Sequence, residues 1–194
     1  MRLIVGISGA TGAILGIKTL EALAELGVET HLILSKWAEA TIHLETSYKV
    51  EDVLKLATVV HAPTNQAASI SSGSFQTDGM VVVPCSMKTL AAIRVGYADG
   101  LIARAADVTL KERRKLVLVT REMPLSSIHL ENMLALSQMG AVILPPMMAF
   151  YNRPKSVEEM ISHVVARTLD QFGIDNQLTR RWASPREVFP RDRG

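Results

Sequence analysis

Residues 104–122 concentrate the charged side chains that could do chemistry in this chain. Within them, the run 115–120 (KLVLVT) is rich in β-branched residues and leucine and too short for a helix, so it predicts a buried strand. Arg121 and Glu122 follow directly, at the edge where open α/β sheets bind ligands. A positive site with one carboxylate set into it suits a reaction that releases phosphate, and further basic residues lie upstream. The alternative is that these charges are simply solvated.

Small hydroxyl side chains recur where three predicted strands end. One alone is more often a helix cap than a ligand. Their recurrence predicts a single crevice that could hold a mononucleotide phosphate and a ribityl chain, which is a description that FMN fits. The hydroxyls belong to Ser8 and Thr11, then Ser35, then Ser86 and Thr89.

The first loop, residues 6–12 (GISGATG), joins a predicted strand to a helix N-terminus, where backbone N–H groups and the helix dipole favour an anion. It fails the Walker A pattern because Ile17 stands between Gly16 and Lys18. It also fails the dinucleotide fingerprint, because its glycines are spaced three apart. Ser35 stands where a dinucleotide-binding protein needs an acidic residue for the ribose. NAD is therefore disfavoured.

Strands alternate with helices along the chain, and most strands are apolar throughout. This pattern predicts an α/β fold, a three-layer Rossmann-like (flavodoxin-like) parallel sheet flanked by helices. We expect one domain over residues 1–182 and a Pro- and Arg-rich tail over 183–194. Pro84 is expected to close its strand. The predicted strands cover 2–8, 30–34, 59–60, 80–83, 115–120 and 141–144. The predicted helices cover 12–26, 36–45, 50–56, 87–95, 101–112, 126–139 and 157–172, and residues 62–78 form a long polar loop.

Composition excludes several classes of protein. A net charge of +2 is too small for a nucleic-acid binder, which needs a concentrated basic face. The single cysteine, Cys85, excludes an internal disulfide and fits a reducing cytosol, and no apolar run approaches the ~18 residues of a membrane span. The five histidines are scattered without zinc-ligand spacing, so we expect no metal. A cytoplasmic protein is expected.

Two motifs in the charged segment resemble those of the flavin prenyltransferase family, the UbiX and Pad1 type once called aromatic or phenylacrylic acid decarboxylases. They are residues 104–114 (RAADVTLKERR) and 120–125 (TREMPL), together with the turn 84–87 (PCSM). The resemblance covers about residues 2–182. It implies a flavoprotein domain in which reduced FMN and dimethylallyl monophosphate react without a metal. A prenyl group becomes attached to flavin N5 and C6, and a UbiD-type decarboxylase uses the product.

The resemblance also implies roles for individual residues. Glu122, Glu45 and Lys111 match the family's catalytic positions, and Arg104 and Trp182 match further positions near its active site. It further implies a homo-oligomer, commonly a dodecamer, with sites shared between subunits. The expected phosphate-binding residues are Lys111, Arg121, Tyr151 and Arg167. The expected FMN-binding residues are Gly9, Ala10, Thr11, Ser35, Ser86, Met87, Lys88, Thr89 and Arg121.

Thr11 is a departure from the family, because many members have Ser there. The hydroxyl is kept, so we expect activity, although a proton-relay role becomes less secure. Three rival functions stay open. An FMN-dependent decarboxylase of cysteine-containing substrates would need a catalytic histidine, for which His61 could be offered. An aromatic acid decarboxylase would need a separate acid-binding site. A non-catalytic flavin carrier resembles flavodoxins, which are usually acidic, whereas this chain has a pI of about 8.8.

Overall fold

The computed structural model describes residues 1–182, and the predicted tail over 183–194 lies outside the described residues. Six strands form one sheet in which every pair is parallel. The strands are β1 (Arg2–Ile7), β2 (Glu29–Leu34), β3 (Val59–His61), β4 (Gly79–Cys85), β5 (Lys115–Thr120) and β6 (Val142–Ile143). The helices are α1 (Ala13–Glu25), α2 (Lys36–Glu45), α3 (Val50–Lys55), α4 (Met87–Val95), α5 (Leu101–Lys111), α6 (Ser127–Gln138) and α7 (Val157–Asp170), with a 3₁₀ turn over Ser69–Ser71.

The strand order is β3-β2-β1-β4-β5-β6, which is the Rossmann order. Without the short edge strand β3, the other five strands follow the flavodoxin order. The chain leaves β1 toward β2 on one side and later returns to β4 on the other side. The carboxyl ends of β1 and β4 therefore flank the point where the winding reverses, which is where sheets of this kind bind ligands. The predicted three-layer architecture is confirmed.

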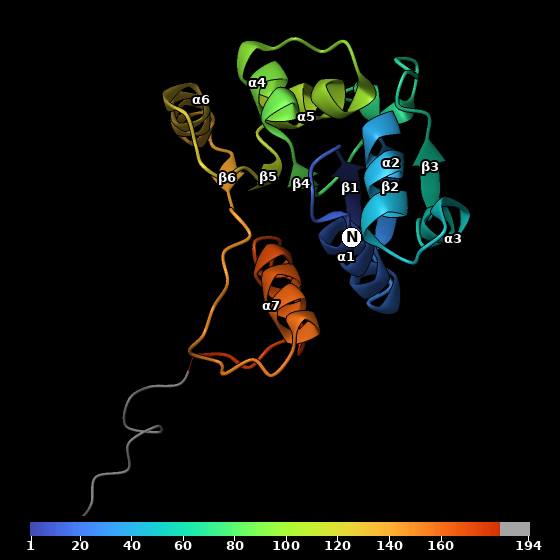
Figure 1. Ribbon diagram of the computed structural model, residues 1–194. Helices are drawn as coiled ribbons and strands as arrows, with labels where there is room; N and C mark the ends of the chain where they lie inside the picture. The colour runs from blue at the N-terminus through green and yellow to red at the C-terminus, as the bar shows by residue number, and fades with distance from the viewer. Residues whose placement is uncertain (183–194) are drawn as a thin grey trace, which may run out of the picture.

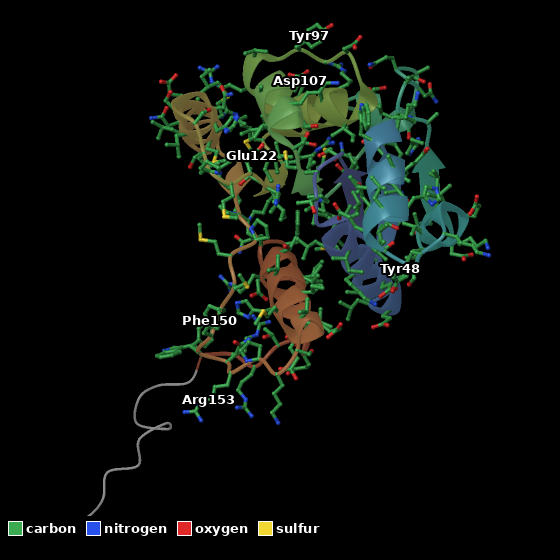
Figure 2. All side chains as sticks on the ribbon, in the orientation of Figure 1. Tyr48, Tyr97, Asp107, Glu122, Phe150 and Arg153 are labelled. Atoms are coloured by element: carbon green, nitrogen blue, oxygen red, sulfur yellow. The ribbon has the colours of Figure 1, made fainter. Side chains whose placement is uncertain are left out.

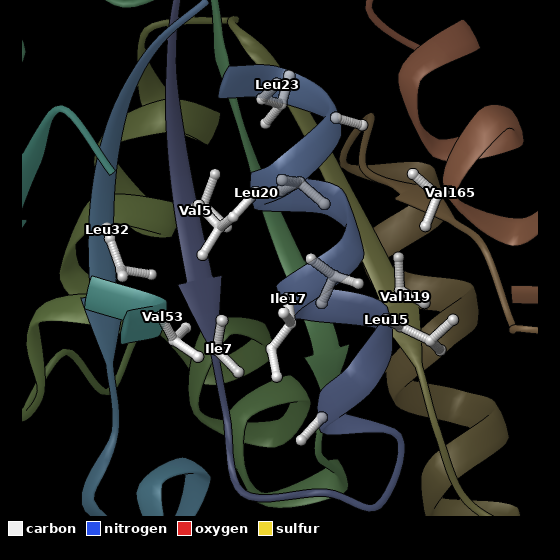
Figure 3. Packing of buried hydrophobic residues seen from close by; sticks show 14 of the residues in the cluster. Val5, Ile7, Leu15, Ile17, Leu20, Leu23, Leu32, Val53, Val119 and Val165 are labelled. Carbon is white, nitrogen blue, oxygen red and sulfur yellow. The ribbon is translucent and has the colours of Figure 1, made fainter. Parts of the chain in front are cut away.

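Alternation along β1 explains why both faces of the sheet are covered. Leu3, Val5 and Ile7 point into a cluster with α1, α3 and α7, whereas Ile4 points into a second cluster with α4 and α5. Figure 3 shows the first cluster, with α1 laid along the sheet. Figure 1 shows α4 and α5 on the other side of the strands. Apolar burial on both faces makes the sheet a rigid support for the loops at its carboxyl edge.

The predicted element boundaries agree with the structure within one to three residues, with one correction. Pro84 does not close its strand, because β4 continues to Cys85. The pairing with β5 is irregular between Val82 and Cys85, so the strand passes the proline with a local shift in register. Thus β4 ends at Cys85, directly before Ser86. Of the helices in residues 1–182, none is long and apolar enough to cross a membrane.

Gly16 lets α1 approach the sheet closely. A Cβ atom at this position would lie 2.5 Å from the carbonyl oxygen of Val83 and 2.9 Å from Cδ1 of Ile7. We expect Gly16→Ala to lower the free energy of unfolding by about 1–3 kcal/mol, because this overpacking outweighs the better helix propensity of alanine. Gly100→Ala is the matched control, since its nearest atom would be 3.8 Å away. Equal midpoints of urea unfolding for the two variants would contradict this account.

Candidate active site

A crevice of about 200 Å³ lies at the carboxyl edge, lined by Ser35, by Lys88 and Thr89 of α4, and by the start of α5. The Ser86 hydroxyl caps α4 by accepting a hydrogen bond from the Thr89 N–H at 3.3 Å. It also donates to Oγ1 of Thr89 at 3.1 Å. Lys88 is exposed at the same helix start. This end of α4 therefore combines a helix dipole, open N–H groups and a free ammonium, which is an arrangement that binds phosphate.

The anion-binding position that the first loop forms at the start of α1 is already occupied by a carboxylate of the same chain. The Glu45 carboxylate, at the end of α2, accepts hydrogen bonds from the N–H groups of Gly12 at 2.8 Å and Ala13 at 3.1 Å. Gly12 directly precedes α1 with φ of 93° and, having no side chain, cannot cap the helix itself. Glu45 thus stabilises the start of α1 from outside. The carboxylate also comes to lie beside the exposed Thr11, so two of the predicted site residues share this corner.

Two of the strand-end hydroxyls stabilise the fold. Ser8 is buried, and its hydroxyl donates to the carbonyl of Pro84 at 2.8 Å while accepting from the N–H of Ser86 at 2.8 Å. It therefore joins the ends of β1 and β4. We expected this hydroxyl to face the crevice, and it does not. Ser35 caps α2 through the N–H of Ala38 at 3.1 Å, and it also lines the crevice.

Arg121 and Glu122 follow the end of β5, and within residues 1–182 they form no ion pair with each other or with Lys111. The Arg121 N–H donates to the carbonyl of Cys85 at 3.0 Å, which fixes its backbone to β4. Within residues 1–182, its guanidinium donates no hydrogen bond. The exposed Glu122 carboxylate accepts only from the next N–H, that of Met123, at 3.1 Å. Figure 2 shows Glu122 at the loop between β5 and α6.

The polar groups at this edge fit FMN. The Thr120 hydroxyl is buried and has no hydrogen-bond partner among the described residues. Arg121 is the next residue in the chain, and the start of α4, which Ser86 caps at the Thr89 N–H, follows directly after Cys85. Buried polar atoms are rarely left unpaired in native proteins, so the unpaired Thr120 hydroxyl at the end of β5 points to a polar ligand at this edge.

Lys111 does not join this group within one chain. It is the last residue of α5, just before β5 begins at the opposite, amino edge of the sheet, and it pairs with Glu112. The six residues of β5 separate it from Arg121 by roughly 20 Å. Arg114 is at the same amino edge and is not a solvated charge, because it donates to the carbonyls of Gly73 at 2.6 Å and Phe75 at 2.8 Å.

Three other predicted residues lie on α7 or on the segments either side of it: Tyr151 before the helix, Arg167 on it and Trp182 after it. The Tyr151 ring contacts the Trp182 ring edge-on at 5.3 Å and the His163 ring at 5.7 Å between centroids. Arg167, one helical turn after His163, lies beside the edge strand β6. Figure 2 shows Phe150 and Arg153, which flank this segment's turn, well away from Glu122. Arg104 is separate again, bound to Asp107 at 2.9 Å and to the carbonyl of Ser71 at 3.2 Å.

The residues that a rival chemistry would need are engaged elsewhere. Burial raises the pKa of the Cys85 thiol to about 12, so it is not a nucleophile near neutral pH. His61 stacks on the buried His31, with 2.9 Å between Nε2 of His61 and Nδ1 of His31. Burial, and secondarily His31, lowers the pKa of His61. A histidine tied to a neighbour in the sheet is poorly placed as a catalytic base.

A family model described as Flavoprotein matches residues 1–171. A probable UbiX-like flavin prenyltransferase of Escherichia coli O157:H7 is 66% identical over 183 residues, which cover 94% of this chain and 93% of that protein. The chain belongs to the flavin prenyltransferase family. The motifs in residues 104–125 predicted this family from the sequence, and the comparisons confirm the prediction.

Two solved structures of this family are closely similar. A dodecameric FMN-dependent UbiX-like decarboxylase from Escherichia coli O157:H7 has a TM-score of 0.93 and 65% identity, covering 95% of this chain and all of that chain (100%). AnUbiX (PadA1), in complex with FMN and dimethylallyl pyrophosphate, also has a TM-score of 0.93, with 58% identity over 94% of this chain and 97% of that chain. The family fold therefore extends over nearly the whole described chain.

The sequence did not single out Asp170. This residue lies three positions after Arg167 on α7 and accepts a hydrogen bond from it at 2.6 Å. The spacing was visible in the sequence, but such pairs occur on the surface of many helices. Its second cationic partner, Arg181, is eleven residues further along and follows no periodic pattern.

Proposed function

We propose that this protein is a flavin prenyltransferase, which transfers a dimethylallyl group from dimethylallyl monophosphate to N5 and C6 of reduced FMN. The observation that carries the proposal is that a guanidinium, Arg121, and a carboxylate, Glu122, are neighbours in the chain at the end of β5, and neither has an ion-pair partner in residues 1–182. Family membership and the similar structure with FMN and dimethylallyl pyrophosphate support it.

The chain's own residues supply charge stabilisation and proton transfer. Breaking the allylic C–O bond leaves negative charge on phosphate, and Arg121 with the family's other cations lowers the barrier by binding that charge. Glu122 donates a proton to the departing phosphate oxygen and later accepts the proton lost from C6. Glu45 holds its carboxylate beside Thr11, on the first loop. Bound reduced FMN supplies the two nucleophilic atoms.

The FMN phosphate belongs at the start of α4. Glu45 already occupies the N–H groups at the start of α1, and a phosphate there would meet its negative charge. The start of α4 has the Ser86 and Thr89 hydroxyls and the Lys88 ammonium. Gly9 and Ala10 belong to the first loop, at the carboxyl end of β1. Gly9 has no room for a side chain, because a Cβ would lie 2.2 Å from Cβ of Trp37.

The prenyl phosphate site is completed by a second copy of the chain. Lys111 and Arg121 lie at opposite edges of one sheet, so the same chain cannot bring both to one phosphate. Tyr151 and Arg167 lie on a third surface, next to exposed apolar residues such as Met147 and Phe150. A homo-oligomer, a dodecamer by analogy with the similar Escherichia coli structure, would bring these surfaces together.

The prenylated FMN leaves this protein for use elsewhere. We propose a UbiD-type decarboxylase as the recipient and the cytoplasm as the location. These two assignments rest on the family resemblance and on the single reduced cysteine.

The test is to incubate the purified protein with reduced FMN and dimethylallyl monophosphate without oxygen and to measure the flavin mass. We expect a flavin heavier by one prenyl group. A parallel reaction with dimethylallyl diphosphate decides the donor. Unmodified FMN in a protein that demonstrably binds FMN would contradict the proposal and favour a flavin carrier.

A further inference from the structure

Asp170, at the end of α7, holds three donors at once. Its carboxylate accepts hydrogen bonds from Nη1 of Arg167 at 2.6 Å, from Nη1 of Arg181, and from Nδ2 of Asn176 at 3.2 Å. The Asp170 side chain is only 17% exposed. Hydrogen bonding to Arg181 is the main cause that lowers the pKa of Asp170, so the group is ionised at neutral pH. One fixed carboxylate therefore serves two guanidinium groups.

The two arginines use this carboxylate differently. Arg181 has both terminal nitrogens engaged, Nη1 with Asp170 and Nη2 with the carbonyl of Asn176 at 3.3 Å. Arg167 has only Nη1 engaged within residues 1–182, and its side chain is 51% exposed. Arg181 thus fixes the carboxylate in place, while Arg167 keeps Nε and Nη2 available for a ligand.

The free side of Arg167 has room for a phosphate ester. Arg167 lines a cavity of about 300 Å³ beside β6, together with apolar residues that include Pro145 and Met147. A guanidinium that is held by one nitrogen keeps a fork of donors for two phosphate oxygens. Asp170 offsets only one of the two guanidinium charges, and the guanidinium that lines the cavity is that of Arg167. A long, exposed arginine loses side-chain conformational entropy when it binds a phosphate. The hydrogen bond to Asp170 already restricts Arg167, so less entropy is lost on binding.

We propose that Asp170 is a positioning residue for prenyl phosphate binding, acting through Arg167. The inference rests on the proposed function, which assigns Arg167 to the phosphate. Loss of the Asp170 charge frees the guanidinium to swing. The KM for dimethylallyl monophosphate should then rise by about tenfold, with a smaller change in kcat and no change in FMN affinity.

Asp170→Asn is compared with Asp175→Asn, a nearby exposed carboxylate that accepts no hydrogen bond within the described residues. KM and kcat come from the mass assay, and FMN affinity from quenching of flavin fluorescence. The same substitution is then made in an Arg167→Ala background. If Asp170 acts through Arg167, Asp170→Asn should raise KM much less in the Arg167→Ala background than in the wild-type protein. An equal rise in KM in both backgrounds would indicate a general structural role and overturn the proposal.

Two further measurements keep the outcomes separate. If Asp170→Asn does not fold, Asp170→Glu and Arg181→Lys replace it; Asp170→Glu should restore most of the affinity and Arg181→Lys should raise KM. Calorimetric titration of dimethylallyl monophosphate into the FMN-bound protein reads binding without turnover. A wild-type protein that binds the ester without prenylating FMN contradicts the proposed function. In that case the calorimetric affinities of the Asp170 and Asp175 variants still test the role of Asp170. Equal affinities of the Asp170 and Asp175 variants overturn the inference alone.

Discussion

Glu122→Gln should slow prenyl transfer by about 10²–10⁴-fold and leave FMN affinity unchanged, because proton transfer by a positioned side chain contributes an effect of this size. The amide keeps the size of the side chain and can accept the N–H of Met123, but it cannot donate and recover a proton. Single-turnover formation of prenylated flavin, followed by mass, measures the chemical step. Flavin fluorescence measures binding in the same samples.

Glu51→Gln, on the exposed face of α3, is the matched control for loss of one carboxylate. It should react at the wild-type rate. Equal loss of FMN binding and turnover in Glu122→Gln would show that Glu122 stabilises the site. A rate within a few-fold of wild type would show that another group transfers the proton.

Lys111→Ala and Arg121→Ala should each lose about 10²–10³-fold in turnover as pure proteins, yet regain activity when they are assembled together. Each variant supplies the cation that the other lacks, because the two residues lie at opposite edges of the sheet and reach one phosphate only from different copies. With random assembly of equal amounts, about a quarter of the sites receive both cations. Co-expression with two different affinity tags, followed by the mass assay on doubly purified protein, measures the recovery.

The control pairs Arg121→Ala with Glu122→Gln. These residues are adjacent in the chain and lie at the same edge, so each mixed site lacks one of them and activity should stay low. Recovery in this control would contradict the assignment of both residues to one copy. No recovery with Lys111→Ala would show that Lys111 acts within its own sheet, or not on phosphate at all.

Most of the helices and strands followed from local patterns. The predicted boundaries of α2, α4 and β5 coincide with the structure, since each has its cap or its apolar run within a few residues. Pro84 was the exception. A proline usually closes a strand, but the neighbouring strand tolerates a shift in register here, and the sequence of β4 alone carries no sign of it.

The strand-end hydroxyls show which predictions local sequence patterns could not make. Ser35 and Thr89 line the crevice, and Thr11 lies at the same carboxyl edge without lining it. Ser8 was expected in the crevice as well, but its partners, Pro84 and Ser86, lie about 76–78 residues away in the chain. Only the pairing of β1 with β4 decides that this hydroxyl is used inside the fold.

The sequence by itself determined the sheet, the edge at which Arg121 and Glu122 lie, and, through its motifs, the family. Tertiary structure decided which charges are free to act. It places Lys111 at the far edge of the sheet and Glu45 on the start of α1, and among the described residues it leaves the Arg121 guanidinium without a partner. Periodicity and capping act over a few residues, so sequence patterns reveal them. Pairing of charges depends on which distant surfaces the packed helices and strands bring into contact, and that is settled only by the whole fold.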